Sequence, residues 1–213
     1  LYNNQLCPPY PECLNNPQNV GYQNTEDCDY IVECQEGYVE YFGFCYYQSD
    51  LDVLQMFIDN SYETINMDMD DNSSGVIEPL ELGYQQWVEG RITYLSGYNI
   101  GISGEIQSEI GNLTNLTYLG LNYNQLTGEI PPEIGNLTNL TSLKLLQNDL
   151  TGEIPSEIGN LTNLNSLWFN NNQLSGVIPE EICNQGDSSP SLYNNQLCPP
   201  YPDCGEGPIT SEE

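Results

Sequence analysis

The sequence predicts an α/β solenoid preceded by a helical cap and a disulfide-rich connector. Three observations predict this fold: a 24-residue period in the second half, a loop rich in oxygen ligands before it, and eight cysteines without any histidine. Such a period is typical of solenoids, whose turns bury their apolar side chains against neighbouring turns. We expect five segments: the end of a preceding module at 1–13, a cysteine-rich connector at 14–45, the helical cap at 46–91, the repeats at 92–191, and a C-terminal cap and tail at 192–213.

The chain of 213 residues is strongly acidic. It has 31 acidic residues, one lysine (Lys144) and one arginine (Arg91), and its formal net charge is -29. We expect no nucleic-acid partner and no direct membrane insertion, because phosphates and anionic lipids are bound by basic groups. Hard cations, above all calcium, suit such a surface. We expect no enzyme, because histidine is missing as a general base and no pair of carboxylates stands out.

The second half repeats one pattern. The segments SGEIQSEIGNLTNL, TGEIPPEIGNLTNL, TGEIPSEIGNLTNL and SGVIPEEICN have glycines at 104, 128, 152 and 176, which are 24 residues apart. One turn follows LxxLxLxxNxL, with alternation at Leu119 and Leu121 that predicts a short strand with inward leucines. An asparagine recurs at 124, 148 and 172. We expect its side-chain amide to satisfy backbone groups of adjacent turns.

Residues 92–197 resemble a leucine-rich repeat array of the type abundant in plant receptor ectodomains, through the motif LTGEIPxxIGNLTNL. The resemblance implies a parallel sheet on the concave side, a second short strand near LTGEIP and 3-10 turns on the convex side. It also implies recognition of partners rather than catalysis. The first turn, RITYLSGYNIGISGE, has Gly97 and Ile100 where leucine and asparagine belong, so we expect an entry turn there.

Aromatic residues lie between the inward leucines and are expected to face outward from the concave sheet. They are Tyr94, Tyr98, Tyr118, Tyr123 and Trp168. Exposed aromatic rings with a polar tip suit interfaces, so this face could bind a glycan or a peptide. The alternative is a polar surface that only favours β-structure.

Six asparagines lie in N-glycosylation sequons. They are Asn72 in NSS and Asn112, Asn115, Asn136, Asn139 and Asn160 in NLT. They are candidate glycosylation sites. The alternative is that Asn and Thr form tight turns as part of the repeat, without any sugar.

The segment Asp70 to Glu81, DDNSSGVIEPLE, precedes the repeats. Its candidate calcium ligands are Asp70, Asn72, Ser74, the carbonyl of Val76, Glu78 and Glu81. With Gly75 at the sharp turn and Ile77 at the apolar position, the segment resembles an EF-hand loop.

The residues on both sides of this loop predict two helices. An entering helix is expected from the spacing of Leu54, Phe57, Ile58, Tyr62, Ile65 and Met69. An exit helix is expected to contain Leu82, Tyr84, Trp87 and Val88 and to end near Gly90. We expect the exit helix to cap the open end of the solenoid, with a calcium ion acting as a structural clamp.

The eight cysteines indicate a disulfide framework and an extracellular location, secreted or at the cell surface. They are Cys7, Cys13, Cys28, Cys34, Cys45, Cys183, Cys198 and Cys204. One scheme pairs Cys183 with Cys198, Cys13 with Cys28, and Cys34 with Cys45, the last across a hairpin in GYVEYFGFCYY. A rival scheme pairs Cys7 with Cys13 and Cys198 with Cys204, as its resemblance to the CxPLxxC ends of plant repeat proteins implies.

Thirteen residues occur twice, as LYNNQLCPPYPEC at Leu1 and as LYNNQLCPPYPDC at Leu192. The second copy has the pattern of a last repeat. The first copy has no earlier repeat on which Leu1 and Leu6 could stack. It would need a surface from a preceding module or from another copy, and such head-to-tail contacts build fibres.

The sequence is therefore consistent with two functions. The first is a structural module of a calcium-stabilised fibre or tandem-repeat surface protein. The second is an adhesin or receptor-like protein that binds a glycan or peptide on the concave face. The doubled segment also fits a plain two-module ectodomain cut at an arbitrary boundary.

Overall fold

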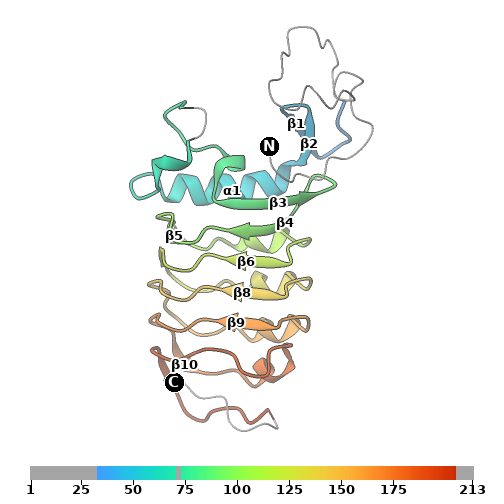
Figure 1. Cartoon of the computed structure of the whole chain (residues 1–213). Coiled ribbons are helices and arrows are strands. Elements are labelled where there is room, and N and C mark those ends of the chain that lie inside the picture. Colours follow the sequence, from blue (N-terminus) through green and yellow to red (C-terminus); the bar gives the residue numbers. More distant parts are fainter. Residues whose placement is uncertain (1–32, 71–72, 205–213) are drawn as a thin grey trace.

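The computed structural model describes residues 33–70 and 73–204. They form an elongated stack of turns, with helix α1 lying across one end and the hairpin β1–β2 beside it (Figure 1). The segment 1–13, most of the connector and the tail after residue 204 lie outside the described residues. The solenoid predicted for the second half is confirmed.

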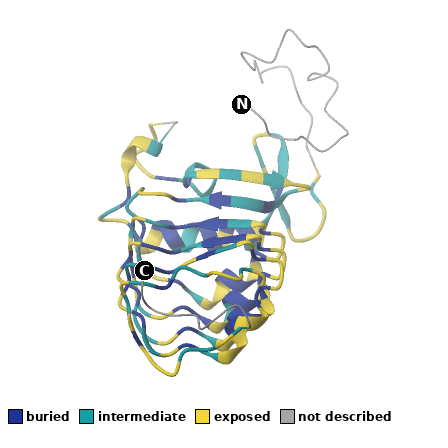
Figure 2. Cartoon of the chain, turned by 60° about the horizontal axis from the view of Figure 1, so that its bottom comes forward, coloured by how far each residue is buried: buried dark blue, intermediate teal, exposed yellow. Residues whose placement is uncertain are grey.

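A five-stranded sheet runs along the stack in the order β3-β4-β6-β8-β9. Its strands are β3 (Tyr84–Val88), β4 (Arg91–Ser96), β6 (Tyr118–Gly120), β8 (Ser142–Lys144) and β9 (Ser166–Trp168). From β4 onward the strands are parallel, and β3 is antiparallel to β4. The central residues Leu95, Leu119, Leu143 and Leu167 pair in register and are all fully buried. Figure 2 shows buried positions recurring along the inside of the stack.

The second short strands and the 3-10 turns that were expected in the repeats are also present. Second short strands occur as the pairs β5–β7 and β10–β11. They are β5 (Ser103–Glu105), β7 (Gln125–Thr127), β10 (Ser175–Val177) and β11 (Gln196–Cys198). The 3-10 turns are η5 (Ser108–Asn112), η6 (Pro132–Asn136), η7 (Ser156–Asn160) and η8 (Glu180–Asn184). A Cβ at Gly135 would lie 2.5 Å from the carbonyl oxygen of Glu157, so successive 3-10 turns approach closely only because glycine is there.

The recurring asparagines join neighbouring turns. The side chain of Asn148 donates to the carbonyl oxygens of Leu121 (3.0 Å) and Leu145 (2.9 Å), and accepts from the N–H of Leu126 (3.1 Å). The same pattern holds along the ladder at Asn124, Asn148, Asn172 and Asn195. The predicted role of these amides is confirmed.

Helix α1 (Gln48–Asn60) closes the first end of the stack, and its buried face includes Leu51, Leu54 and Phe57. Its C-terminus is fixed by Ser61, whose hydroxyl donates to the carbonyl oxygen of Phe57 (2.6 Å) and accepts from the N–H of Ser103 (2.9 Å). The helix is thus hydrogen-bonded directly to the first repeat.

A buried ion pair ties α1 to the sheet. Asp50 is fully buried and accepts from Arg91 Nε (2.9 Å), Arg91 Nη2 (3.0 Å) and the N–H of Ile92 (2.9 Å). The guanidinium lies 4.3 Å from the ring centroid of Tyr47. The hydrogen bond that Arg91 donates to Asp50 raises the pKa of Arg91 above its ordinary value, although burial opposes this.

The helices predicted around the loop 70–81 are partly wrong. Helix α1 ends at Asn60, and the side chain of Tyr62 is 83% exposed; Met67–Met69 form a separate 3-10 turn, η3. The exit helix is replaced by one 3-10 turn, η4 (Pro79–Glu81), followed by strand β3. Exposure alternates along β3 with period two, and pairing with β4 satisfies its backbone. The solenoid is therefore capped by α1 and β3.

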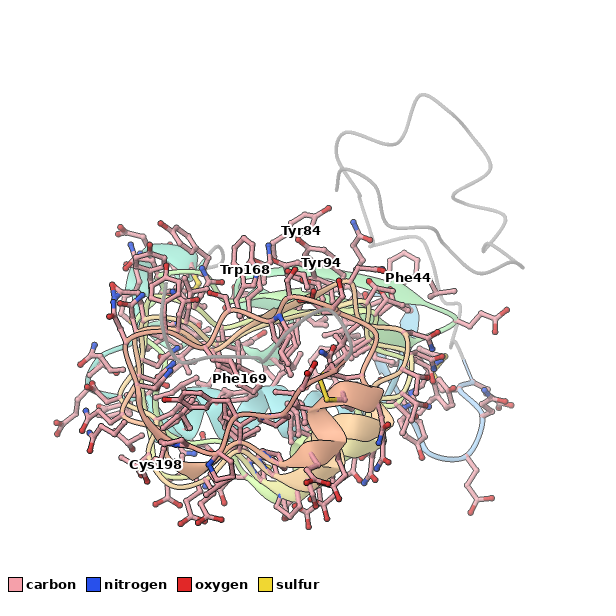
Figure 3. The ribbon with its side chains drawn as sticks, turned by 90° about the horizontal axis from the view of Figure 1, so that it is seen from below. Phe44, Tyr84, Tyr94, Trp168, Phe169 and Cys198 are labelled. Carbon is pink, nitrogen blue, oxygen red and sulfur yellow. A yellow bond between two sulfur atoms is a disulfide. The ribbon has the colours of Figure 1, made fainter. Side chains whose placement is uncertain are left out.

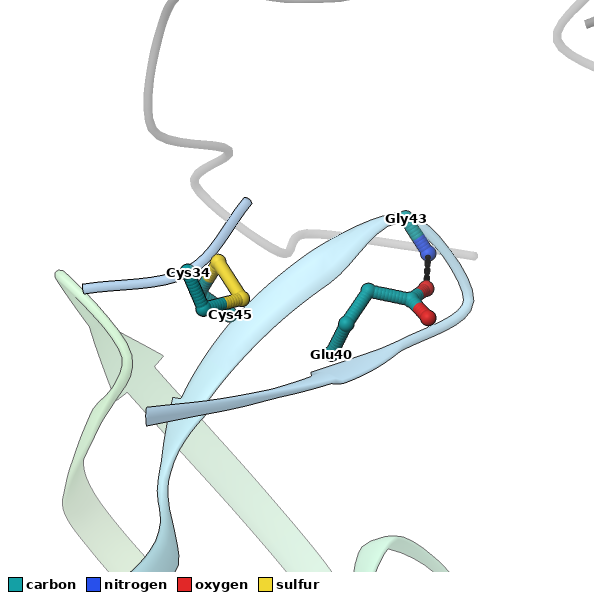
Figure 4. The surroundings of a disulfide bond; sticks show 4 residues. All are labelled: Cys34, Glu40, Gly43 and Cys45. Carbon is teal, nitrogen blue, oxygen red and sulfur yellow. Dashed lines mark hydrogen bonds between the residues drawn. A yellow bond between two sulfur atoms is a disulfide. The ribbon is translucent and has the colours of Figure 1, made fainter. Parts of the chain in front are cut away.

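The hairpin of β1 (Tyr38–Tyr41) and β2 (Phe44–Tyr47) forms as predicted, and the Cys34–Cys45 disulfide is confirmed. Figure 4 shows this disulfide beside the hairpin, and at the turn of the hairpin the N–H of Gly43 donates to the carboxylate of Glu40. The hairpin is thus held by a covalent link and by its own turn.

At the other end, Cys183 is bonded to Cys204, so both predicted pairings of Cys198 are wrong. Cys198 ends strand β11 with an exposed side chain and is the one described cysteine without a disulfide. Cys204 instead returns to pack against the buried core, where it meets Cys183 on η8. The predicted bonds of Cys7, Cys13 and Cys28 lie outside the described residues.

Candidate ligand-binding face

The outward side of β3, β4, β6, β8 and β9, called the sheet face below, carries a row of aromatic rings. The ring centroids of Tyr84 and Tyr94 are 5.6 Å apart in an edge-on contact. Those of Tyr94 and Tyr118 are 4.2 Å apart, with an interplanar angle of 4°. Viewed from below in Figure 3, Tyr84, Tyr94 and Trp168 lie on the same side of the stack, whereas Phe169 lies inside it. These rings form a continuous surface across strands.

Lys144 continues the row. Its Nζ lies 5.6 Å from the ring centroid of Tyr118 and 4.1 Å from that of Trp168. Both distances are within the range of a cation–π interaction. Five successive strands therefore supply Tyr84, Tyr94, Tyr118, Lys144 and Trp168 to one row.

The register of the sheet explains this arrangement. Tyr94 pairs with Tyr118, and Gly120 pairs with Lys144. A Cβ at Gly120 would lie 2.8 Å from the ring of Tyr118, so the glycine makes room for that ring. Burial, together with the neighbouring Tyr94, raises the pKa of Tyr118 to about 12. Its phenol is therefore neutral at physiological pH.

A second aromatic pair lies just after β4 and β6. The ring centroids of Tyr98 and Tyr123 are 5.4 Å apart, and the residues are 54% and 45% exposed. The structure thus brings the five predicted aromatic residues into two contacting groups. It adds Tyr84, which the sequence placed in a helix.

Ser142 is a polar residue of the sheet face without a partner. It is 9% exposed, and its hydroxyl has no hydrogen bond among the described residues. Along the sheet it pairs with Tyr118 on one side and with Ser166 on the other. A buried hydroxyl without a partner costs free energy, and a ligand could satisfy it.

Comparison with known families agrees with this geometry. Residues 91–184 match the family model of a leucine-rich repeat region. Residues 91–184 are thus similar to a leucine-rich repeat region. None of the curated proteins searched matches the chain significantly.

Solved structures similar to this chain include plant ectodomains. The BIR2 ectodomain from Arabidopsis thaliana is 29% identical, with 70% of this chain and 82% of that chain covered and a TM-score of 0.56. The BIR3–SERK2 complex from Arabidopsis thaliana is 27% identical, with coverage of 72% and 98% and a TM-score of 0.53. The plant peptide hormone receptor RGFR1 in complex with RGF2 is 45% identical, but only 49% of this chain and 17% of that chain are covered, with a TM-score of 0.48. This chain spans less than a fifth of that receptor's length.

Two of the predicted calcium ligands in the loop before the repeats accept backbone hydrogen bonds. Asp70 accepts from the backbone N–H groups of Ser74 (3.0 Å) and Gly75 (2.7 Å), and Glu81 accepts from the N–H of Glu78 (3.0 Å). Within residues 33–70 and 73–204, no three Asp, Glu, Cys or His side chains form a group that could hold a metal ion. Calcium binding by this loop stays a prediction, since Asn72 lies outside the described residues.

Two further sets of predicted positions can be placed. Val76 is 55% exposed and Ile77 is buried, whereas Asn72 lies outside the described residues. The sequons of the leucine-rich repeat region are all exposed, at Asn112, Asn115, Asn136, Asn139 and Asn160. Asn139 also donates to the carbonyl oxygen of Thr114 (2.8 Å), as expected of a turn-forming residue. Glycosylation at these positions stays a prediction.

No helix in the described part of the chain is both long and apolar enough to cross a bilayer.

Proposed function

We propose that this chain is the recognition module of an extracellular, receptor-like protein, and that a peptide or a protein partner binds on the sheet face. The observation that carries the proposal is the continuous row of Tyr84, Tyr94, Tyr118, Lys144 and Trp168, which no other part of the described chain covers.

Both the chemistry and the setting of this row support binding. Tyr84 is 56% exposed and Trp168 is 40% exposed, although apolar rings are normally buried. Tyrosine and tryptophan are enriched among the residues that dominate binding energy, because they contribute large rigid surfaces with a polar tip. The similar BIR3 structure is itself a complex with SERK2. The two disulfides fit an oxidising, extracellular location.

The direct test is to select peptides that bind the folded chain from a random display library, and then to measure their affinity for variants. We expect Trp168→Ala to weaken binding by about 30-fold, since a tryptophan hot spot contributes about 2 kcal/mol. Calorimetry measures the effect.

Tyr62→Ala is the matched control, because Tyr62 is an aromatic residue of the cap that is 83% exposed and lies outside the sheet. It should leave the affinity unchanged. If the selected peptides bind Trp168→Ala and Tyr62→Ala equally well, the sheet face is not the binding site.

Head-to-tail assembly is a second candidate, favoured by the structure of the second thirteen-residue copy. Leu192 and Leu197 are buried against the repeat before them, at 1% and 7% exposed, and Cys204 is bonded to Cys183. Residues 1–13 have the same sequence except for one acidic residue. We infer that they need an equivalent surface with its own cysteine. The surface in this chain is already used by residues 192–204, so a preceding module or another copy would supply it.

Electron microscopy and sedimentation test the assembly together with its calcium dependence. We expect fibres that shorten when calcium is removed with EGTA, and loss of assembly in Leu6→Asp, since Leu6 corresponds to the buried Leu197. Gln5→Ala is the control, because Gln196 is exposed. A monodisperse monomer both with and without calcium rejects this candidate.

A further inference from the structure

Lys144 is the free positive charge of the described chain. The sequence has two basic residues, and the other, Arg91, is engaged by the buried carboxylate of Asp50. Lys144 Nζ faces two aromatic rings, and no oxygen of the described residues accepts a hydrogen bond from it. An ammonium group has three donors, and aromatic faces satisfy its charge without using them fully. The donors of Lys144 are therefore available to a ligand.

A second, independent observation lies beside it. Ser142 and Lys144 are two residues apart in β8, so their side chains point to the same face of the sheet. The hydroxyl of Ser142 is buried and has no hydrogen-bond partner in the described part of the chain. The Cα atoms of two such residues lie about 7 Å apart along a strand, so a hydroxyl donor and a long, flexible ammonium side chain on the same face can offer hydrogen bonds to one small acceptor group.

The surrounding charges identify the acceptor. Strands β3, β4, β6, β8 and β9 contain no aspartate or glutamate. The formal net charge of -29 comes from acidic residues elsewhere in the chain. An anionic group is therefore attracted only at Lys144, whereas the rest of a ligand meets an acidic surface and binds best when it is neutral or basic.

We infer that Lys144 and Ser142 form a subsite for one carboxylate of an otherwise neutral or basic peptide, with Tyr118 and Trp168 packing against the neighbouring residue of that peptide. The inference rests on the function proposed above. The carboxylate comes from the C-terminus of the peptide or from an acidic side chain. A polyanionic glycan is disfavoured, because its repeated charges would be repelled by the acidic surface.

The unique lysine makes a direct test possible. The sequence has a single lysine, so the side-chain NMR signals of protein labelled with ¹³C-lysine report on Lys144 alone. The indole N–H of Trp168 gives a second signal. The probes are the tetrapeptide Arg-Gly-Gly-Tyr with a free C-terminus, the same peptide as its amide, Arg-Glu-Gly-Tyr amide, and hexagalacturonate.

We expect the free acid to shift both signals in a saturable way and to bind about tenfold more tightly than the plain amide, because a charge-assisted hydrogen bond is lost. If Arg-Glu-Gly-Tyr amide restores the affinity, an acidic side chain is the source of the carboxylate. If only the free acid binds, the C-terminus is the source.

Variants separate charge from shape. With the Trp168 signal as readout, Lys144→Gln should remove the preference for the free acid, and Lys144→Arg should keep it within about threefold. Ser142→Ala should weaken the free acid several-fold without loss of thermal stability, since its hydroxyl has no hydrogen-bond partner within residues 33–70 and 73–204. The NMR signals of the backbone amides report whether each variant is folded.

The opposing results are distinct. If acid and amide bind equally and both shift Trp168, the carboxylate subsite is wrong and the proposed function stands. If hexagalacturonate binds more tightly than every peptide, the ligand is a glycan and the peptide assignment is wrong. If no probe shifts Lys144 or Trp168, this subsite is overturned, and the display selection then decides the proposed function separately.

Discussion

Asp50→Ala is expected to lower the free energy of unfolding by about 3–5 kcal/mol, since removal of one partner leaves a buried charge uncompensated. The carboxylate is fully buried and accepts three hydrogen bonds, two from Arg91 and one from the N–H of Ile92. Without it, the guanidinium and a buried backbone donor lose their partner where α1 meets the first repeat strand. Urea denaturation followed by circular dichroism measures the loss.

Asp59→Ala is the control on the same helix. Asp59 is exposed and accepts only from the side chain of Gln55 (2.7 Å), so its removal should change stability by less than about 1 kcal/mol. Equal stability of the Asp50→Ala and Asp59→Ala proteins would contradict the role of the buried pair in holding the cap.

Asn148→Ala is expected to cost about 3 kcal/mol, because a buried N–H loses its acceptor and the three hydrogen bonds donated by the Asn148 side chain disappear. The N–H of Leu126 donates to the side-chain oxygen of Asn148 (3.1 Å), and the variant removes that acceptor. The backbone carbonyls of Leu121 and Leu145 each keep one hydrogen bond from the side chain of a neighbouring asparagine. Because each turn of a solenoid is stabilised by its neighbours, we also expect unfolding to become less cooperative.

Asn148→Asp refines this test. It keeps the acceptor but removes two amide donors and adds a charge, so it should be at least as destabilising as Asn148→Ala. Asn139→Ala removes a single bond from an exposed asparagine and should cost less than about 1 kcal/mol. If both Asn148 variants match the Asn139 control, the asparagine ladder does not stabilise the stack.

The repeat could be predicted from sequence because it depends on local, recurring interactions. Leu119, Leu143 and Leu167 recur at one period and pair in register. Each asparagine of the ladder bonds to backbone groups of its own turn and of the turn before it. Such a pattern is repeated several times in the sequence, so a single irregular turn does not hide it.

The cap could not be predicted in the same way. Tyr84 and Trp87 fit one face of a helix as well as alternate sides of a strand, and pairing with β4 decides the matter. The position of Tyr84 on the sheet face could therefore be recognised only from the structure. The partner of Cys204 likewise depends on how the last turn returns to η8, which no spacing of cysteines defines.

The candidate binding residues were found from alternation along the strands, but their chemistry depends on contacts. The sequence placed Trp168 outward, but its cation–π contact with Lys144 and the unpartnered hydroxyl of Ser142 could be found only in the structure. Sequence position predicts which face a residue occupies; packing decides whether its polar atoms are satisfied.

The central claim is that a ligand covers the sheet face, and the fluorescence of Trp168 tests it most directly. The chain has two tryptophans, so Trp87→Phe leaves Trp168 as the single tryptophan, whose emission can be excited selectively over that of the tyrosines. We predict that a saturating peptide from the display selection lowers acrylamide quenching of Trp168 several-fold, because the bound peptide excludes the quencher from the ring. Unchanged quenching, with a peptide that calorimetry shows to be bound, would contradict the claim.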